Sequence, residues 1–423
     1  MSGEEPQLGR RRPVRLNRST GTFGRFVRVT LIVLSVLFLS GISFLLLNVQ
    51  MRLEVKNLEG DDGGESGALK FNNCANIETT KGHYVSSHGL MSSANYIFME
   101  DEVATKKAMQ SFGFLRIFQT ALRRYALVPN CVTEIDHQFV TVYVQSGLIP
   151  TFARYSHSLP FSYALLSGDD DNTMPQDVSR LAFDYVIESP LLVKWYTQNV
   201  GIPEDDRNKM KGGMNKLYPM PIGLDYHTLA TRPEKVPHWG PPATETEQEK
   251  ELNSILKKAL PLKDRQLKVY STFHLNYLPD SVKPFTDREE AFRDLPSALV
   301  DHEQKKITRR ETWEKQAQYS FVASPHGRGL DCHRTWEALT LGCIVIVKSS
   351  SLDSLYAGLP VLIVDKWKDV TAELLQEAFT KYTAIVANTA YEQTQGFRSL
   401  HLQHWIAKIA APVLTEEVAL EAR

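Results

Sequence analysis

The sequence predicts two α/β domains that follow a single membrane-spanning helix. Three features of the 423 residues lead to this prediction. An uncharged apolar run near the N-terminus is as long as a bilayer is thick, short apolar strands alternate with helical segments, and a proline-rich stretch divides that alternating part in two. The hydrophobic content of 43% is that of a globular protein with a sizeable core.

The N-terminal apolar run covers residues 29–49, "VTLIVLSVLFLSGISFLLLNV", and carries no charge. At about 1.5 Å per residue, a helix of this length spans roughly 30 Å, which is the thickness of the hydrocarbon core. Residues 1–28 are rich in arginine, whereas residues 50–70 mix both charge signs and are rich in glycine. The positive-inside rule therefore predicts a type II protein with a cytosolic tail (1–28), a signal anchor (29–49) and a luminal stem (50–70). A cleaved signal peptide is the alternative, but its small-residue cleavage site is missing.

The first predicted domain covers residues 71–230. Residues 139–145 ("FVTVYVQ") and 162–168 ("SYALLSG") have the β-branched and apolar content of strands. The segment 189–201 begins with serine and ends with glycine, which favours a helix. Two prolines within residues 216–226 favour an extended piece.

A linker and a helix, residues 231–264, precede the second predicted domain, residues 265–423. The linker is proline-rich, and the helix has a predicted capping box at Thr246 and Glu249. The second domain carries nearly continuous apolar strands, which are typical of a parallel sheet covered on both faces. These predicted strands are residues 266–273, 319–325, 343–349 and 359–365.

Polar residues gather between the second and third of these strands, where the chain reads "HGRGLDCHRTWEALTLG". Ligands of doubly wound sheets bind where such a loop enters a helix. The glycines allow close backbone approach, and the free N–H groups of a helix at 332–341, with Asp331 as its predicted N-cap, favour a diphosphate. Arg328 and Arg334 offer charge-assisted contacts to phosphate oxygens, and Glu337 suits the hydroxyl groups of a ribose.

This segment resembles the nucleotide-sugar motif of exostosin-like glycosyltransferases of the GT-B class, in which an arginine and a glutamate open a helix read as R-x-x-E-A-L-x-x-G-C. The matching residues are Arg334, Glu337, Ala338, Leu339, Gly342 and Cys343. Val345 stands where the family usually has proline, and Gly329 stands where retaining enzymes carry a second glutamate. The resemblance therefore favours an inverting reaction. It is close across this segment and loose over residues 265–390.

The resemblance implies a GT-B-like fold of two Rossmann-type domains in a Golgi glycosyltransferase with a luminal catalytic part. Such an enzyme moves a sugar from a UDP- or GDP-sugar to a hydroxyl of a glycan or glycoprotein without a required metal, while a base deprotonates that hydroxyl. The nucleotide-sugar-binding residues implied here are His326, Gly327, Arg328, Gly329, Asp331, His333, Arg334 and Glu337. The base is expected in the first domain, and its unranked candidates are Asp169, Asp170, Asp171, Asp225, His137 and His227.

Two alternatives stay open. Asp169-Asp170-Asp171 follows a predicted strand and resembles the Asp-x-Asp element of metal-dependent GT-A transferases, in which Asp169 and Asp171 would hold Mn²⁺ or Mg²⁺. The second alternative is a non-catalytic, membrane-tethered glycan-binding partner, because exostosin-like proteins often work in pairs; a homo- or hetero-dimer is left open. The part of the chain after the anchor has no basic footprint for nucleic acid, and hydrolase or P-loop motifs are missing.

Overall fold

The computed structural model describes residues 72–73, 82–100, 125–129, 131–132, 139–209, 213–275 and 286–411. The predicted cytosolic tail, signal anchor and stem lie outside these residues. Within the described part of the chain, no helix is both long enough and apolar enough to cross a membrane. The elements below all belong to one unit, Lys70–Arg423.

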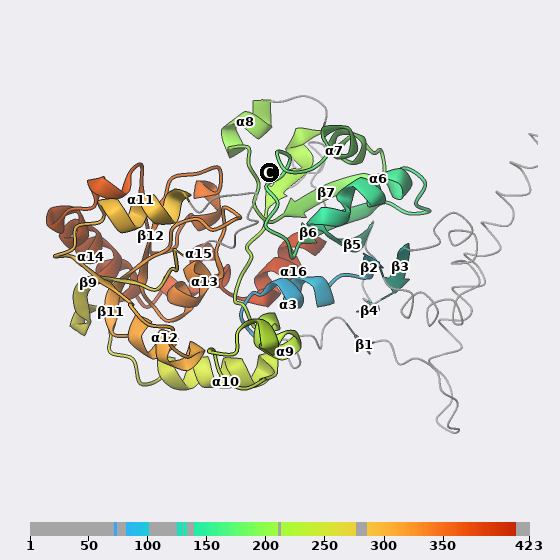
Figure 1. The fold of residues 1–423 in the computed structure, drawn as a ribbon. Coiled ribbons are helices and arrows are strands. Elements are labelled where there is room, and N and C mark those ends of the chain that lie inside the picture. Colours follow the sequence, from blue (N-terminus) through green and yellow to red (C-terminus); the bar gives the residue numbers. More distant parts are fainter. Residues whose placement is uncertain are drawn as a thin grey trace, which may run out of the picture. The chain divides into compact units, whose positions relative to one another are not determined.

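The described residues form a first sheet of six strands in the order β3-β2-β5-β6-β7-β8 (Figure 1). The strands are β2 (Tyr96–Glu100), β3 (Tyr125–Pro129), β5 (Val140–Gln145), β6 (Tyr163–Gly168), β7 (Leu192–Thr197) and β8 (Leu217–Pro219). β2 and β3 are antiparallel, and the other described pairs are parallel. The strands predicted at 139–145 and 162–168 are confirmed as β5 and β6, and the extended piece at 216–226 contains β8. Apart from this sheet, β1 (Asn72–Asn73) pairs with β4 (Cys131–Val132).

The prediction of a helix at 189–201 is wrong, because this segment contains β7, a central strand of the first sheet. β7 pairs with β6 on one side and with β8 on the other, and nearly all of its residues are buried. The indole N–H of Trp195 donates to Ser167 Oγ of β6 at 2.8 Å. Aromatic side chains that pack on both faces of a sheet outweigh the helix-end signals of a serine and a glycine.

The second sheet has five strands within the described residues, all parallel, in the order β10-β9-β11-β12-β13. The strands are β9 (Gln266–Ser271), β10 (Val300–His302), β11 (Tyr319–Ala323), β12 (Ile344–Lys348) and β13 (Val361–Val364). The four predicted strands are confirmed as β9, β11, β12 and β13. β11 and β12 are buried at nearly every residue, as expected for central strands with helices on both faces. The prediction of two α/β domains with mainly parallel sheets is confirmed.

Helices cover both sheets (Figure 1). Their bounds are α3 (Ser87–Ser92), α6 (Ile149–Ser156), α7 (Arg180–Ile187), α8 (Glu204–Lys209), α9 (His227–Thr231), α10 (Glu245–Leu256), α11 (Thr286–Asp294), α12 (Arg309–Gln316), α13 (His333–Thr340), α14 (Ala372–Val386), α15 (Gln395–Arg398) and α16 (Leu402–Ala410). The helix predicted at 332–341 is confirmed as α13.

Helix α16, the last in the described part of the chain, returns to the first domain. The backbone N–H of Leu402 donates to His83 O at 2.9 Å, and the backbone N–H of Val85 donates to Leu400 O at 2.9 Å. Lys194 of β7 donates from Nζ to Ala411 O at 2.6 Å. The predicted second domain, residues 265–423, therefore includes a helix that packs on the first domain.

The helix α10 follows the linker and begins earlier than predicted. Its capping box joins Thr244 and Glu247, so the prediction of a box at Thr246 and Glu249 is wrong. Glu249 instead faces the first domain, where its carboxylate accepts a hydrogen bond from the backbone N–H of His83 at 2.8 Å. A buried carboxylate needs such donors, and this need places Glu249 on the inner face of the helix.

Candidate functional site

The carboxyl ends of the two sheets meet where residues after β7 contact the loop after β11. The backbone N–H of Asp331 donates to Asn199 Oδ1 at 2.8 Å, and Ser351, after β12, donates from Oγ to Val200 O at 2.5 Å. A Cβ on Gly329 would lie 2.7 Å from Asn199 Nδ2. Glycine at position 329 therefore allows this close contact between the domains.

Asp331 joins the two domains at the start of α13. Its carboxylate accepts hydrogen bonds from the backbone N–H groups of Ile222 at 2.8 Å and Cys332 at 2.9 Å, and from the indole N–H of Trp336 at 2.9 Å. The prediction that Asp331 is the N-cap is wrong, because Cys332 occupies that position and its side chain makes no capping hydrogen bond. Asp331 is 4% exposed and serves as an internal acceptor for buried donors.

Arg334 lies in the first turn of α13 and reaches the end of β9. Its Nε donates to Thr272 Oγ1 at 3.2 Å, while its Nη1 is buried and has no hydrogen-bond partner among the residues that the structure describes. Burial, and secondly the charge of Arg288 from α11, lower the pKa of Arg334 to about 10. Two neighbouring guanidinium groups with a buried, unpartnered N–H form an arrangement that a bound anion would stabilise.

The loop 326–331, which contains Gly327 and Gly329, lies beside Arg288. A Cβ on Gly327 would lie 2.9 Å from Arg288 Nη2, so the glycine leaves room for the guanidinium group. The backbone N–H of His326 donates to Asp287 Oδ2 at 2.8 Å. Arg328 is partly exposed. Arg288 thus lies close to both Gly327 and the charge of Arg334. The sequence analysis missed Arg288 because it lies in a charged surface helix without a motif.

A cavity of about 520 Å³ lies between the two domains beside this loop. Thr173, Gln176 and Gly201 of the first domain line it, together with Lys348 and His326 of the second domain. Of the predicted nucleotide-sugar-binding residues, His326 alone lines this cavity. The cavity therefore adjoins the predicted site and does not coincide with the arginine pair.

Glu337 lies one turn after His333 and is buried in an internal ion pair. Its carboxylate accepts a hydrogen bond from Arg309 Nη2 at 2.7 Å and from the indole N–H of Trp313 at 3.1 Å. The Arg309 guanidinium lies over the rings of Trp239 and Trp313, 4.7 Å from each centroid. The structure thus gives Glu337 two partners from α12, and its predicted contact with a ribose stays a prediction.

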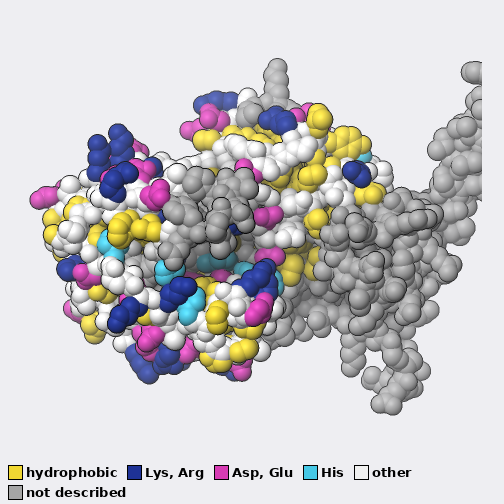
Figure 2. All heavy atoms as spheres, in the orientation of Figure 1, with side chains coloured by type: hydrophobic (Ala, Val, Ile, Leu, Met, Phe, Trp, Pro, Cys, Tyr) yellow, Lys and Arg dark blue, Asp and Glu magenta, His cyan; other side chains and the backbone are white. Residues whose placement is uncertain are grey.

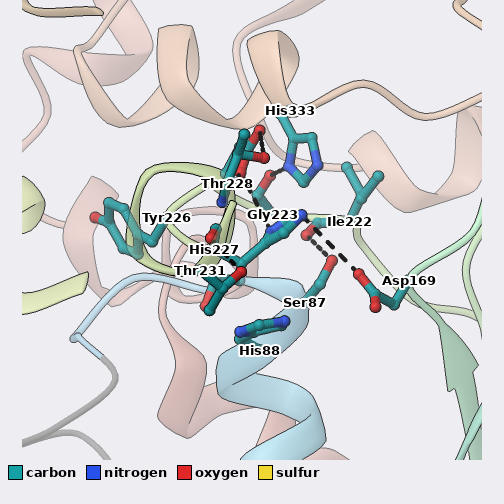
Figure 3. Close-up of polar contacts among 12 residues, drawn as sticks. Ser87, His88, Asp169, Ile222, Gly223, Tyr226, His227, Thr228, Thr231 and His333 are labelled. Atoms are coloured by element: carbon teal, nitrogen blue, oxygen red, sulfur yellow. Dashed lines mark hydrogen bonds and ion pairs between the residues drawn. The ribbon is translucent and has the colours of Figure 1, made fainter. Parts of the chain in front are cut away.

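A cluster of histidines and aspartates lies next to the start of α13. Figure 3 shows the ring of His227 between those of His88 and His333, with Asp169 to one side. His227 Nδ1 is 3.2 Å from Asp225 Oδ1, and its Nε2 is 4.0 Å from Asp169 Oδ1. His333 contacts Gly223 O through Nδ1 at 2.7 Å. Figure 2 shows several histidine side chains near the middle of one face, beside lysine and arginine side chains.

This cluster brings together three of the predicted catalytic residues, Asp169, Asp225 and His227, with the predicted donor-site residue His333. It adds His88, which the sequence analysis missed because the surrounding residues, "SSHGLM", contain no motif typical of a functional site. Asp171 is exposed and does not join the cluster: its backbone N–H donates to Asp170 Oδ1 at 2.7 Å. His137 lies outside the described residues.

The surroundings of the cluster keep Asp225 charged and His227 neutral. Burial would raise the pKa of Asp225, but His333, His227 and Arg309 outweigh it and hold this pKa well below the usual value. Burial lowers the pKa of His227 to about 4, against the opposing effect of Asp225. At neutral pH, His227 is therefore a neutral imidazole beside a carboxylate, and a neutral imidazole has a nitrogen lone pair that accepts a proton or binds a metal.

We expect replacement of His227 by glutamine to make folding less sensitive to acid. Between pH 6.5 and about 4 the unfolded chain binds a proton at this residue and the folded chain does not. The folded state therefore loses stability as the pH falls through this window. In urea unfolding with EDTA, the wild type should lose about 2 kcal/mol more than His227→Gln between pH 7 and about pH 4.5. If the wild type and His227→Gln lose the same stability over this pH range, the imidazole of His227 is exposed to solvent.

No protein-family profile matches the chain, and no curated protein matches it in sequence. Among solved structures, it is similar to an α,α-trehalose-phosphate synthase (UDP-forming) from Burkholderia vietnamiensis, with 11% identity over 75% of this chain and 81% of that chain and a TM-score of 0.34. A trehalose-6-phosphate protein from E. coli bound with UDP-2-fluoro glucose shows 10% identity over 74% and 86%, with a TM-score of 0.34. WaaG, a glycosyltransferase involved in lipopolysaccharide biosynthesis, shows 12% identity over 75% and 98%, with a TM-score of 0.32. Similarities at this level do not identify a family or a function.

Proposed function

We propose that the chain is a Golgi-type, exostosin-like glycosyltransferase with a GT-B-like fold that moves a sugar from a UDP- or GDP-sugar to a hydroxyl group of a glycan or glycoprotein. The observation that carries this proposal is the arginine pair at the strand ends of the second domain. Arg334 has a buried Nη1 without a hydrogen-bond partner among the described residues, Arg288 is close enough to lower its pKa, and Gly327 borders Arg288. This site suits a diphosphate that gains negative charge as it leaves the sugar.

The proposed reaction needs a base on the opposite side of the sugar from the diphosphate. Asp169, Asp225 and His227 come from the first domain and approach the start of α13 through His333. In this proposal the acceptor hydroxyl enters next to that cluster and attacks the anomeric carbon, while the arginines neutralise the leaving group. Golgi location and type II topology rest on residues 1–70 and on the sequence resemblance, which also favours inversion.

A thermal-shift screen of the purified full-length protein against UDP-, GDP- and CMP-sugars tests this proposal. A ligand that binds only the folded state at about one hundred times its Kd stabilises that state by about 2.7 kcal/mol, so one nucleotide class should raise the melting temperature and the others should not. Free UDP or GDP should compete with the matching sugar nucleotide. If no nucleotide sugar binds, the proposal is wrong; if one binds but no acceptor yields product, the chain is a binding partner.

A further inference from the structure

Two imidazoles and a carboxylate from three separate segments converge in the first domain. His88 comes from α3, Asp169 follows β6, and His227 begins α9. One possible ligand atom from each residue lies within 4.8 Å of the other two. The ring centroids of His88 and His227 are 4.8 Å apart, and His227 Nε2 is 4.0 Å from Asp169 Oδ1 (Figure 3).

Each of the two histidines has a carboxylate behind it. His88 Nδ1 is 3.3 Å from Glu245 Oε1, and His227 Nδ1 is 3.2 Å from Asp225 Oδ1. Glu245 and Asp225 are 5% and 6% exposed. A buried carboxylate beside one ring nitrogen favours the proton on that nitrogen and leaves the other nitrogen for a ligand, which is the usual support of metal-binding histidines.

The buried ring of His227 is not held at Nδ1 by any hydrogen bond from the described residues. It is 7% exposed, and its Nδ1 has no hydrogen-bond partner among the described residues, although Asp225 Oδ1 lies 3.2 Å away. Buried imidazoles normally have partners for their polar atoms. A cation on Nε2 would fix the ring and let Nδ1–H donate to Asp225.

We propose that His88, Asp169 and His227 bind one divalent first-row transition cation such as Zn²⁺. Two nitrogen donors and one oxygen donor suit these ions, whereas Mg²⁺ and Ca²⁺ prefer oxygen donors alone. Metal–ligand bonds of about 2 Å place ligand atoms about 3.3 Å apart in a tetrahedral site, so atoms that now lie within 4.8 Å of one another must approach by up to about 1.5 Å.

The site is open on one side. His88 and Asp169 are 15% and 25% exposed at their side chains, so a cation reaches them from solvent. With three protein ligands, at least one coordination position remains for water or for a ligand oxygen. The cation would face the region where the acceptor hydroxyl is proposed to enter. The inference does not rest on the proposed function, in which arginines neutralise the diphosphate.

Cation binding to the full-length protein, stripped with a chelator and measured without nucleotide, tests the proposal. Calorimetry should show one Zn²⁺ per chain and much weaker Mg²⁺ binding, and Co²⁺ should produce visible absorption bands from its ligands. His88→Gln and Asp169→Asn are partly exposed changes that should fold, and each should weaken Zn²⁺ binding at least about tenfold. His404→Gln, a partly exposed histidine of α16 outside the cluster, should bind Zn²⁺ as the wild type does.

Two results would overturn the metal proposal. One is a stripped wild-type protein that binds no Zn²⁺ or Co²⁺, and the other is Zn²⁺ binding that persists in both variants. Either result would leave His227 as a proton acceptor without a metal. A nucleotide sugar that binds while Zn²⁺ does not would retain the proposed function and remove this inference alone.

Discussion

Replacing Arg334 with methionine should reduce the thermal shift caused by a nucleotide sugar by about half or more and raise the stability of the unliganded protein. Within the described part of the chain, the buried guanidinium has an Nη1 without a hydrogen-bond partner and a second cation, Arg288, beside it, and its pKa is lowered to about 10, chiefly by burial. A long apolar side chain removes this cost and still packs against Phe273, over which the guanidinium lies. We expect a gain of about 1 kcal/mol in unfolding free energy.

The same change removes charge-assisted hydrogen bonds to the phosphate oxygens, each of which contributes about 1.5–3 kcal/mol. Nucleotide-sugar affinity should therefore fall at least about tenfold, as measured by calorimetry. Opposite effects on stability and on binding are the signature of a group held in place for a ligand.

Arg310→Met is the matched control for this experiment. Arg310 lies on the surface of α12, is 49% exposed, and pairs with Glu251 and Glu314. Its replacement should leave nucleotide binding unchanged and alter stability by less than about 1 kcal/mol. If Arg334→Met keeps the ligand-induced shift and loses stability, the guanidinium is a structural group, and the proposed diphosphate site is wrong.

The parts of the fold that the sequence predicted are those fixed by local patterns. β11 and β12 are continuous apolar runs, and α13 follows a glycine loop, so their types follow from neighbouring residues alone. The prediction missed β7 because pairing with β6 and β8 makes this segment a strand. The serine and glycine that end the segment 189–201 carry no information about that pairing. Tertiary context decides such segments.

The sequence predicts a candidate site around the loop that enters α13, and the structure gives several of its residues partners within the protein. Asp331 and Glu337 were both expected to face a ligand, but their partners come from elsewhere in the chain: Ile222 lies 109 residues away from Asp331, and Arg309 lies 28 residues away from Glu337. His88 and Arg288 lie in segments without any motif. Folding places His88 beside His227 and Arg288 beside Arg334, and the spacing of these residues in the sequence does not predict either contact.

Glu337→Ala should destabilise the protein by about 3–5 kcal/mol, because it leaves the buried Arg309 without its counter-charge. If Glu337 were exposed on the surface, the same substitution would lower the free energy of unfolding by less than about 1 kcal/mol. Arg309 and Glu337 are both less than 10% exposed, and the indole N–H of Trp313 would also lose its acceptor. Urea unfolding measures the loss. Glu337→Gln retains an acceptor oxygen and should lose less stability than Glu337→Ala.

Glu314→Ala is the control, since Glu314 is 43% exposed and pairs with Arg310 on the surface of α12. It should cost less than about 1 kcal/mol. A loss for Glu337→Ala that is no larger than this control would contradict the buried ion pair. If nucleotide binding fails in Glu337→Gln while stability is kept, the carboxylate holds the ribose. If stability falls and binding persists in the folded fraction, the ion pair fixes α13 against α12, and through α13 it fixes the position of Arg334.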